Sequence, residues 1–156
     1  MTDEDDVTRR LSELASTWHG EIPVTSTMDV VPAAFEEHTL TVRATLAPNV
    51  NVHGTAFAGS LYAVAALSGW GLVHLELANA DLPGSIVIAE GRIVYRRPVQ
   101  EDIVARCSTD DAEVTRVMAA LRTDGRVRWP LTASIGAAGR EAVRFEGVYA
   151  IRIRDR

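Results

Sequence analysis

Residues 49–60, NVNVHGTAFAGS, place a polar turn directly before an apolar stretch, 56–73, that contains no charged residue. The turn holds two asparagines and a histidine, and the stretch after it predicts a long helix over about 56–78. At a helix N-terminus the first backbone N–H groups lack partners, and the helix dipole favours negative charge. Polar side chains gathered there can help to stabilise a carbonyl oxygen as it becomes an oxyanion. The sequence therefore predicts a central helix with a candidate active site at its start.

Two other interpretations of this region are weaker. The apolar stretch reaches the length of a short membrane span, but glycines and serines interrupt it and no lysine or arginine flanks it. The spacing of Gly54 and Gly59 superficially resembles a phosphate-binding loop, but the lysine that such a loop needs after its second glycine is absent. A helix buried in the middle of a soluble fold explains the pattern better.

The composition limits the class of protein. The chain has 156 residues, enough for one domain with a substantial core. Its 47% hydrophobic and 24% charged residues are typical of a soluble globular protein, and its net charge of −5 disfavours non-specific binding of nucleic acid. Cys107 is the single cysteine, so no internal disulfide can form, and a reducing, cytoplasmic location is expected. The acidic residues 3–6 are followed by no apolar core, which argues against an export signal.

The remaining elements are predicted from hydrophobic periodicity. Amphipathic helices are expected at 3–18 and 110–122, and strands are expected at 28–31, 39–46, 85–96, 103–108, 127–135 and 143–153. Gly91 inside a strand indicates a bulge or a close approach of two backbones. Strands wrapped around one buried helix form an α+β fold in two layers. We divide the chain into an N-terminal amphipathic helix, 1–20, and a single domain, 21–156.

Several segments together resemble the hotdog-fold acyl thioesterases. More narrowly, they are similar to the "putative thioesterase" domain that is found C-terminal to an acetyltransferase-like domain in some bacteria. The segments are 21–24 (EIPV), 46–51 (LAPNVN), 54–62 (GTAFAGSLY), 68–71 (SGWG), 95–99 (YRRPV) and 145–147 (FEG).

This resemblance implies a curved antiparallel sheet around the central helix. It also implies a homodimer, or a tetramer, with sheets joined edge to edge and acyl-thioester sites between subunits. The pantetheine arm would enter near 47–59, so coenzyme A or phosphopantetheine would be part of the substrate rather than a cofactor. Many members carry His-Gly-Gly before the helix and an acidic residue two turns later; this chain has Phe57-Ala58-Gly59 and the sequence AALS at 65–68.

The catalytic candidates are Asn51, His53, Ala58, Gly59 and Ser68. Asn51 could orient a water molecule or hold the thioester carbonyl, or it could bond its own backbone as turn asparagines do. His53 could act as a general base, or be a solvated turn residue. The N–H group of Ala58 or Gly59 could donate to an oxyanion. Ser68 could position water, although helix packing is the alternative.

The substrate-binding candidates are Asn49, Thr55, Phe57, Tyr62, Arg96 and Arg97. Asn49 is the more structural of the two asparagines, and Thr55 is expected as the cap of the helix N-terminus. Tyr62 could line an acyl tunnel or fill the core. Arg96 and Arg97 could bind the phosphates of coenzyme A or the acidic surface of a carrier protein, or be solvated at a strand end. The four histidines show no metal-ligand spacing, so no metal is expected.

The function expected from these residues and this resemblance is hydrolysis of an acyl thioester, on acyl-CoA or acyl-carrier protein, in fatty acid metabolism. The first alternative is a non-catalytic module that binds an acyl chain or an acyl-carrier partner, because the helix lacks a carboxylate. A dehydratase or hydratase on the same fold is a third interpretation, for which His53 is the one nearby acid–base group.

Overall fold

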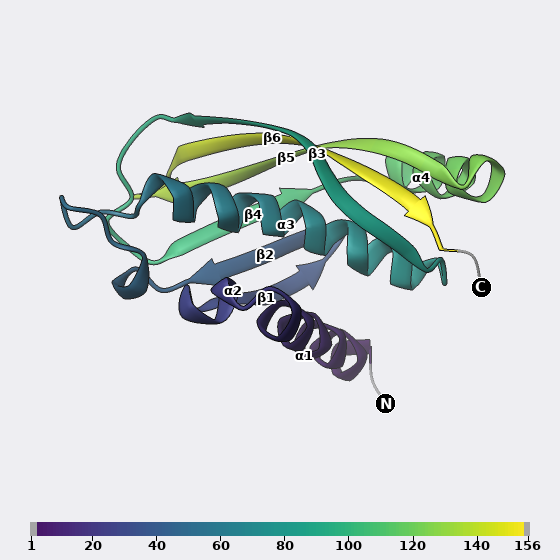
Figure 1. Cartoon of the computed structure of the whole chain (residues 1–156), viewed down its shortest axis with the longest axis horizontal. Coiled ribbons are helices and arrows are strands. Elements are labelled where there is room, and N and C mark those ends of the chain that lie inside the picture. Colours follow the sequence, from purple (N-terminus) through teal and green to yellow (C-terminus); the bar gives the residue numbers. More distant parts are fainter. Residues whose placement is uncertain (1–2, 155–156) are drawn as a thin grey trace.

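The apolar stretch after the polar turn forms a 22-residue helix, α3 (Ala58–Asn79), at the centre of the molecule. We describe residues 3–154 from a computed structural model (Figure 1). A six-stranded sheet curves around α3, with the order β1-β2-β4-β5-β6-β3 and every neighbouring pair antiparallel. The strands are β1 (Val30–Glu36), β2 (Thr39–Ala44), β3 (Gly84–Tyr95), β4 (Ile103–Ser108), β5 (Arg126–Ala137) and β6 (Arg140–Ile153). The α+β hotdog architecture expected from the sequence is confirmed.

Helix α3 is apolar on nearly every side, which is typical of a helix buried within a fold. By length and composition it could also cross a membrane, and it is the one such helix among residues 3–154, but 61% of its apolar window is buried inside the fold. Two glycines let neighbours approach it closely. A Cβ atom added to Gly69 would lie 2.1 Å from the Tyr149 hydroxyl, and one on Gly71 would lie 2.6 Å from the Leu40 side chain.

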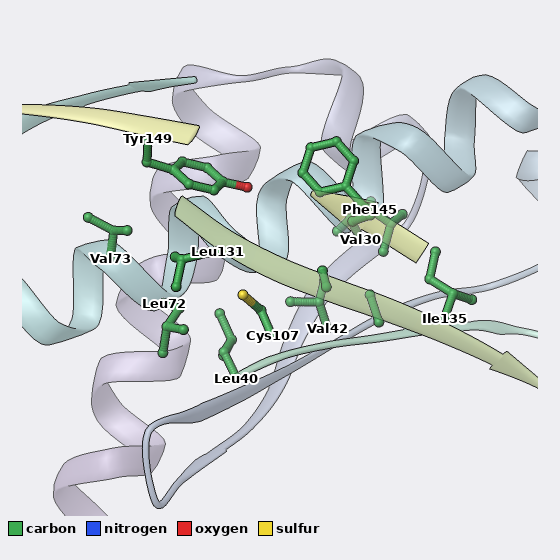
Figure 2. Packing of buried hydrophobic residues seen from close by; sticks show 14 of the residues in the cluster. Val30, Leu40, Val42, Leu72, Val73, Cys107, Leu131, Ile135, Phe145 and Tyr149 are labelled. Carbon is green, nitrogen blue, oxygen red and sulfur yellow. The ribbon is translucent and has the colours of Figure 1, made fainter. Parts of the chain in front are cut away.

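The core lies between α3 and the concave face of the sheet (Figure 2). On β2, Leu40, Val42 and Ala44 are buried whereas the residues between them face outward, which is the alternation expected of a strand with one wet face. The strand is shorter than predicted: it ends at Ala44, and Leu46 precedes a short 3-10 turn, η1 (Ala47–Asn49), because Pro48 cannot continue the ladder.

The N-terminal helix α1 (Asp3–Glu21) extends past the predicted end at residue 18 and packs into the core. Leu14 and Trp18 are fully buried, and both lie close to Gly71 of α3. One turn of helix, α2 (Val24–Thr27), leads from α1 to the sheet. The helix predicted at 110–122 is α4 (Asp111–Asp124). Asp110 caps its start, and Gly125, in the left-handed conformation, ends it.

Strand β1 differs most from its prediction, 28–31, because it begins at Val30 and continues to Glu36. Pro32 lies inside it, next to an irregularity in the register with β2. Proline is tolerated there because β1 is an edge strand. Glu37 and His38, both with positive φ, then form the tight turn to β2.

The feature predicted from Gly91 is present in β3. The register between β3 and β6 shifts between Ile88 and Glu90, just before this glycine. A Cβ atom on Gly91 would lie 2.0 Å from the Tyr62 hydroxyl, so the glycine is needed where α3 passes over the strand. Strand β3 forms the second edge of the sheet, and its outer edge is unpaired in the single chain.

Candidate active site

The polar turn folds into a tight loop that is tied to its surroundings at both ends. Within it, the Asn51 N–H donates to the Thr55 carbonyl at 2.8 Å, and Gly54 has a positive φ of 75°. The Ala56 N–H donates to the Val99 carbonyl at 2.8 Å. The loop therefore has a fixed position beside the segment that follows β3, and Figure 1 shows both at the same end of α3.

Asn51 bonds its own loop with both ends of its amide. Its Oδ1 accepts from the N–H groups of His53 at 2.9 Å and Thr55 at 3.2 Å. Its Nδ2 donates to the Thr55 hydroxyl at 2.8 Å and to the Ala56 carbonyl at 3.4 Å. This geometry is that of a turn asparagine. In this conformation Asn51 shapes the loop and has no free donor to hold a carbonyl.

Asn49 is buried and joins three segments. Its Nδ2 donates to the carbonyls of Met28 at 2.8 Å and Thr45 at 2.7 Å, and its own carbonyl accepts from the Phe57 N–H at 2.7 Å. Its Oδ1 has no hydrogen-bond partner among the described residues. Asn49 thus fixes where α3 begins relative to β1 and β2, as expected of the structural member of the pair.

The residue at the N-terminal cap of α3 is not the predicted Thr55. The residue at the cap position is Phe57, with extended backbone angles and no side-chain hydrogen bond, so the expectation that Thr55 caps the helix is wrong. The Thr55 hydroxyl is instead bonded by Asn51. The first intrahelical donor is the Leu61 N–H, which bonds the Phe57 carbonyl. No hydrogen bond within residues 3–154 uses the N–H groups of 58–60, so they remain available to a ligand.

A cleft of about 380 Å³ lies beside this helix start. It brings together residues from the loop, the first turn of α3 and the segment after β3: Asn51, Thr55, Ala56, Ala58, Leu61, Tyr95, Arg96, Arg97, Pro98 and Val99. Five of the eleven predicted site residues therefore meet, although they come from two parts of the chain.

Tyr95 is a residue of this cleft that sequence reasoning missed. Its hydroxyl donates to the Ala58 carbonyl at 2.9 Å, which ties the end of β3 to the first turn of α3. Burial raises its pKa, so the hydroxyl stays protonated and remains a donor at neutral pH. No local pattern indicates this role, because an aromatic residue near the end of a strand is common in sheets.

The two arginines of the cleft are partly held by the β5–β6 hairpin. The Arg96 Nε lies 3.2 Å from the Glu141 carboxylate, and the Arg97 Nε donates to the Glu141 carbonyl at 3.1 Å. Both backbone N–H groups point to the Ala142 carbonyl. About half of the Arg96 side chain remains exposed, so its guanidinium can still reach an anion at the mouth of the cleft.

The other predicted residues do not line the cleft. Ser68 is fully buried, about 15 Å along α3 from Ala58, and its hydroxyl donates to the Ala65 carbonyl at 2.6 Å, which fits the helix-packing interpretation. His53 is exposed. The ring of Phe57 folds over Gly59, since a Cβ there would lie 2.5 Å from the ring. The Tyr62 ring packs edge-on against Phe145.

A second polar cluster lies near the far end of α3 and was also missed. His38 donates from Nδ1 to the buried carboxylate of Glu76 at 2.6 Å and from Nε2 to Asp111 at 2.7 Å. The hydrogen bond to Glu76, followed by the one to Asp111, raises the pKa of His38. The residues are far apart in sequence, so no spacing pattern could reveal them. The cluster joins the β1–β2 turn, α3 and α4, far from the cleft.

Neither metal chemistry nor thiol chemistry is indicated at the cleft. Among residues 3–154, no group of three or more His, Cys, Asp or Glu side chains is arranged to hold a metal ion. Cys107 is buried in the core, and burial raises its pKa to about 12, so its thiol stays protonated.

Comparison with known proteins agrees with this architecture. Residues 11–153 match the family described as "Putative thioesterase (yiiD_Cterm)". A solved structure of a "putative thioesterase" from Shewanella oneidensis is 31% identical, with a TM-score of 0.81 over 94% of this chain and 99% of that one. A protein of unknown function from Chlorobaculum tepidum is 28% identical, with a TM-score of 0.91 over 95% of this chain and 97% of that one.

A third structure, a "Probable Thioesterase" from Pseudomonas aeruginosa, is 19% identical and shares the fold, with a TM-score of 0.80 over 92% of this chain and 95% of that one. The family match covers most of the chain. The chain therefore belongs to the "Putative thioesterase (yiiD_Cterm)" family of hotdog-fold proteins, and this membership supports thioester hydrolysis as its general class of activity.

Proposed function

We propose that this protein hydrolyses acyl thioesters of coenzyme A or acyl-carrier protein in the cleft at the start of α3. The observation that carries the proposal is the free N–H group of Ala58, the first of three unpartnered N–H groups at 58–60, because Ala58 lines a cleft with a polar loop and two arginines on its walls. A thioester carbonyl directed at these groups would gain stabilisation as its oxygen becomes negative. Water attacks the carbonyl carbon, the C–S bond breaks, and the thiolate takes the proton that the water gives up.

The residues of the cleft, of its loop wall and of the first turn of α3 have distinct parts in this proposal. The N–H group of Ala58 or Gly59 donates to the oxyanion, and Asn51 keeps the loop that carries His53 in place. His53 is exposed and does not line the cleft itself, but it is carried by the loop that forms one wall, and it is the proposed acceptor of the proton from water. Tyr95 fixes the first turn of α3, and Arg96 and Arg97 hold the anionic part of the carrier.

The proposal includes a homodimer joined through β3. This strand has 12 residues and an unpaired outer edge, on which Val87 and Ile88 are 59% and 41% exposed. A long edge strand with exposed apolar side chains is a template for pairing with another chain. Antiparallel pairing of two β3 strands would place the partner's strand beside the cleft. A tetramer would need a further contact.

Proline substitution at the helix start tests the oxyanion hole directly. Ala58 is the first helical residue, where proline fits without disturbing the helix, and Phe57 before it has the extended backbone that proline requires. Ala58→Pro removes one N–H group, so we expect kcat on a short- to long-chain acyl-CoA panel to fall about 10²–10³-fold with little change in Tm. Ala58→Ser keeps the N–H group and serves as the control. Full activity in both Ala58→Pro and Gly59→Pro would refute the proposed oxyanion hole.

One observation favours the alternative of a non-catalytic acyl-binding module. No carboxylate lines the cleft among the described residues, and the helix positions two turns in are occupied by Ala65 and Ala66. Saturable binding of acyl-CoA by the folded protein, without thiol release from acyl-CoA or acyl-carrier protein, would favour this alternative over hydrolysis.

A further inference from the structure

The cleft at the start of α3 opens beside a patch of exposed arginines at one end of the sheet. Arg96 and Arg97 lie on the wall of the cleft itself. Three more arginines lie on the neighbouring strands, Arg92 on β3 and Arg140 and Arg144 on β6. All five residues are exposed, and Figure 1 shows the end of β3 and the β5–β6 hairpin at the same end of the molecule as the start of α3. We call these five residues the arginine rim.

Ion pairs join the arginine rim and the cleft wall into one continuous surface. The Glu141 carboxylate lies 3.2 Å from Arg96 of the cleft wall and 3.6 Å from Arg144 of β6. The Glu146 carboxylate lies 3.6 Å from Arg144 and 3.7 Å from Arg92. Arg144 and Glu146 alternate with buried residues, so they lie on the face of the sheet away from α3. The surface therefore runs from the cleft wall, over the end of the hairpin, onto that outer face.

The arginine rim carries positive charge that the fold uses little. Arg97 bonds a backbone carbonyl of the hairpin, and within residues 3–154 neither Arg97 nor Arg140 makes an ion pair. The ion pairs of the other three involve side chains that are at least 35% exposed, and such pairs contribute little to stability. A partner's carboxylates can therefore replace them at small cost.

The rim is positive although the chain as a whole is negative. Its five guanidinium groups are accompanied by the carboxylates of Glu141, Glu146 and Glu101, the last of which bonds the backbone of Ala138 in the hairpin. The whole chain has a net charge of −5. A positive patch on an acidic protein concentrates attraction for a negative partner at one place, and here that place is the mouth of the cleft.

The spread of the rim favours a folded partner over a small phosphate-bearing ligand. Arg140 and Arg144 are separated by about 13 Å along β6, at the rise of an extended strand. Phosphate groups are bound by guanidinium groups that converge in a concave site. Complementary charge distributed over a broad, exposed surface instead steers and orients the surface of another protein.

We propose that the arginine rim docks the acidic surface of an acyl-carrier protein, so that protein-bound acyl thioesters are the preferred substrates over free acyl-CoA. This proposal rests on the proposed function and narrows it. A carrier docked on the rim extends its phosphopantetheine arm past Arg96 and Arg97 into the cleft that the Ala58 N–H group lines. The side chains of Arg92 and Arg144 stand on the face of the sheet, so pairing of two β3 edges leaves them exposed.

Binding of purified holo-acyl-carrier protein, measured by calorimetry on the full chain, tests the rim without requiring turnover. We expect Arg140→Gln/Arg144→Gln to bind it at least about tenfold more weakly than the wild type, and the wild-type affinity to fall as salt is added. The matched control is Arg126→Gln/Arg152→Gln, which removes the same charge from β5 and from the opposite end of β6. All four positions are exposed, so both double variants should keep a Tm close to that of the wild type.

If turnover is present, the two substrate classes should respond differently. KM for acyl-carrier protein should rise at least about tenfold in Arg140→Gln/Arg144→Gln, whereas KM for the matching acyl-CoA should stay within about twofold of the wild type. Three results would overturn the proposal: no binding of the holo-carrier protein by the wild type, equal weakening in both double variants, or an equal rise in KM for the two substrates.

The outcomes also separate this proposal from the proposed hydrolysis. Turnover of acyl-CoA without binding of the carrier protein would leave hydrolysis standing and remove the docking surface. Binding of the carrier protein through the rim, without thiol release from any acyl thioester, would do the reverse. Binding of phosphatidylglycerol vesicles through the same arginines, without binding of the carrier protein, would assign the rim to a membrane and overturn the proposal.

Discussion

Asn51 holds the loop before α3 with four hydrogen bonds from one side chain. In Asn51→Ala all four are lost, and two backbone N–H groups lose their acceptor. We expect the unfolding free energy to fall by about 1–3 kcal/mol and kcat/KM to fall with it, because the loop wall of the cleft shifts. Asn51→Asp keeps the acceptor and should show a smaller loss. A variant with wild-type Tm and strongly reduced kcat would instead indicate direct contact with the substrate.

Substitution of Ser68, in contrast to that of Asn51, is expected to have little effect on activity or stability. Its hydroxyl is fully buried and donates to a carbonyl of its own helix, which Ser68→Ala would leave with its ordinary helical bond. We expect kcat/KM to stay within about twofold of the wild type and stability to change by no more than about 1 kcal/mol. Thiol release by the purified variant checks this, and a hundredfold loss would restore a catalytic role.

At the scale of single residues, the sequence predicted which segments meet but not what each side chain does there. Asn51, Ala58 and Arg96 lie at one cleft because a polar turn before an apolar helix and arginines at a strand end are local signals. The use of the Asn51 amide and the bond from Tyr95 to Ala58 depend on side-chain directions, which no local pattern encodes.

At the scale of elements, the His38 cluster joins the β1–β2 turn to α3 and α4. The pKa of His38 is raised above its usual value of 6.5 in the folded protein. Its stabilising contribution is therefore complete below about pH 6.5 and is lost as pH rises through the raised pKa. We expect the unfolding free energy of the wild type to decline across that range, relative to His38→Gln, in denaturant titrations at matched ionic strength. Equal pH profiles for the two proteins would contradict this role.

Most helices and strands could be predicted from the sequence, because the spacing of hydrophobic residues shows which face of an element is buried. The strand Ile103–Ser108 has the predicted bounds, and α3 begins two residues later than expected. Strand β1 was mostly missed because Pro32 and the alanines after it carry little strand signal, although an edge position and a register irregularity accommodate them. Tertiary context, not local preference, decides such a strand.

At the scale of the whole molecule, the two edge strands of the sheet differ in how well each could pair with a second chain. The β3 edge is long and carries exposed Val87 and Ile88, whereas β1 is short and contains a proline. A charged residue on an edge strand opposes pairing with another chain. We therefore expect Ile88→Lys to convert the proposed dimer to a monomer, whereas Val31→Lys on β1 should leave it intact. Light scattering and sedimentation, with Tm as a check on folding, distinguish the two.

The same pair of variants tests whether the cleft needs its partner. In the proposed arrangement the partner's β3 lies beside Tyr95 and Arg96, so a monomer has an incomplete thioester cleft. Ile88→Lys should then lose turnover together with dimerisation, and Val31→Lys should lose neither. A folded Ile88→Lys monomer with full activity would show that one chain suffices. A dimer that persists in Ile88→Lys but dissociates in Val31→Lys would move the interface to β1, and the partner's strand would then not lie beside the thioester cleft.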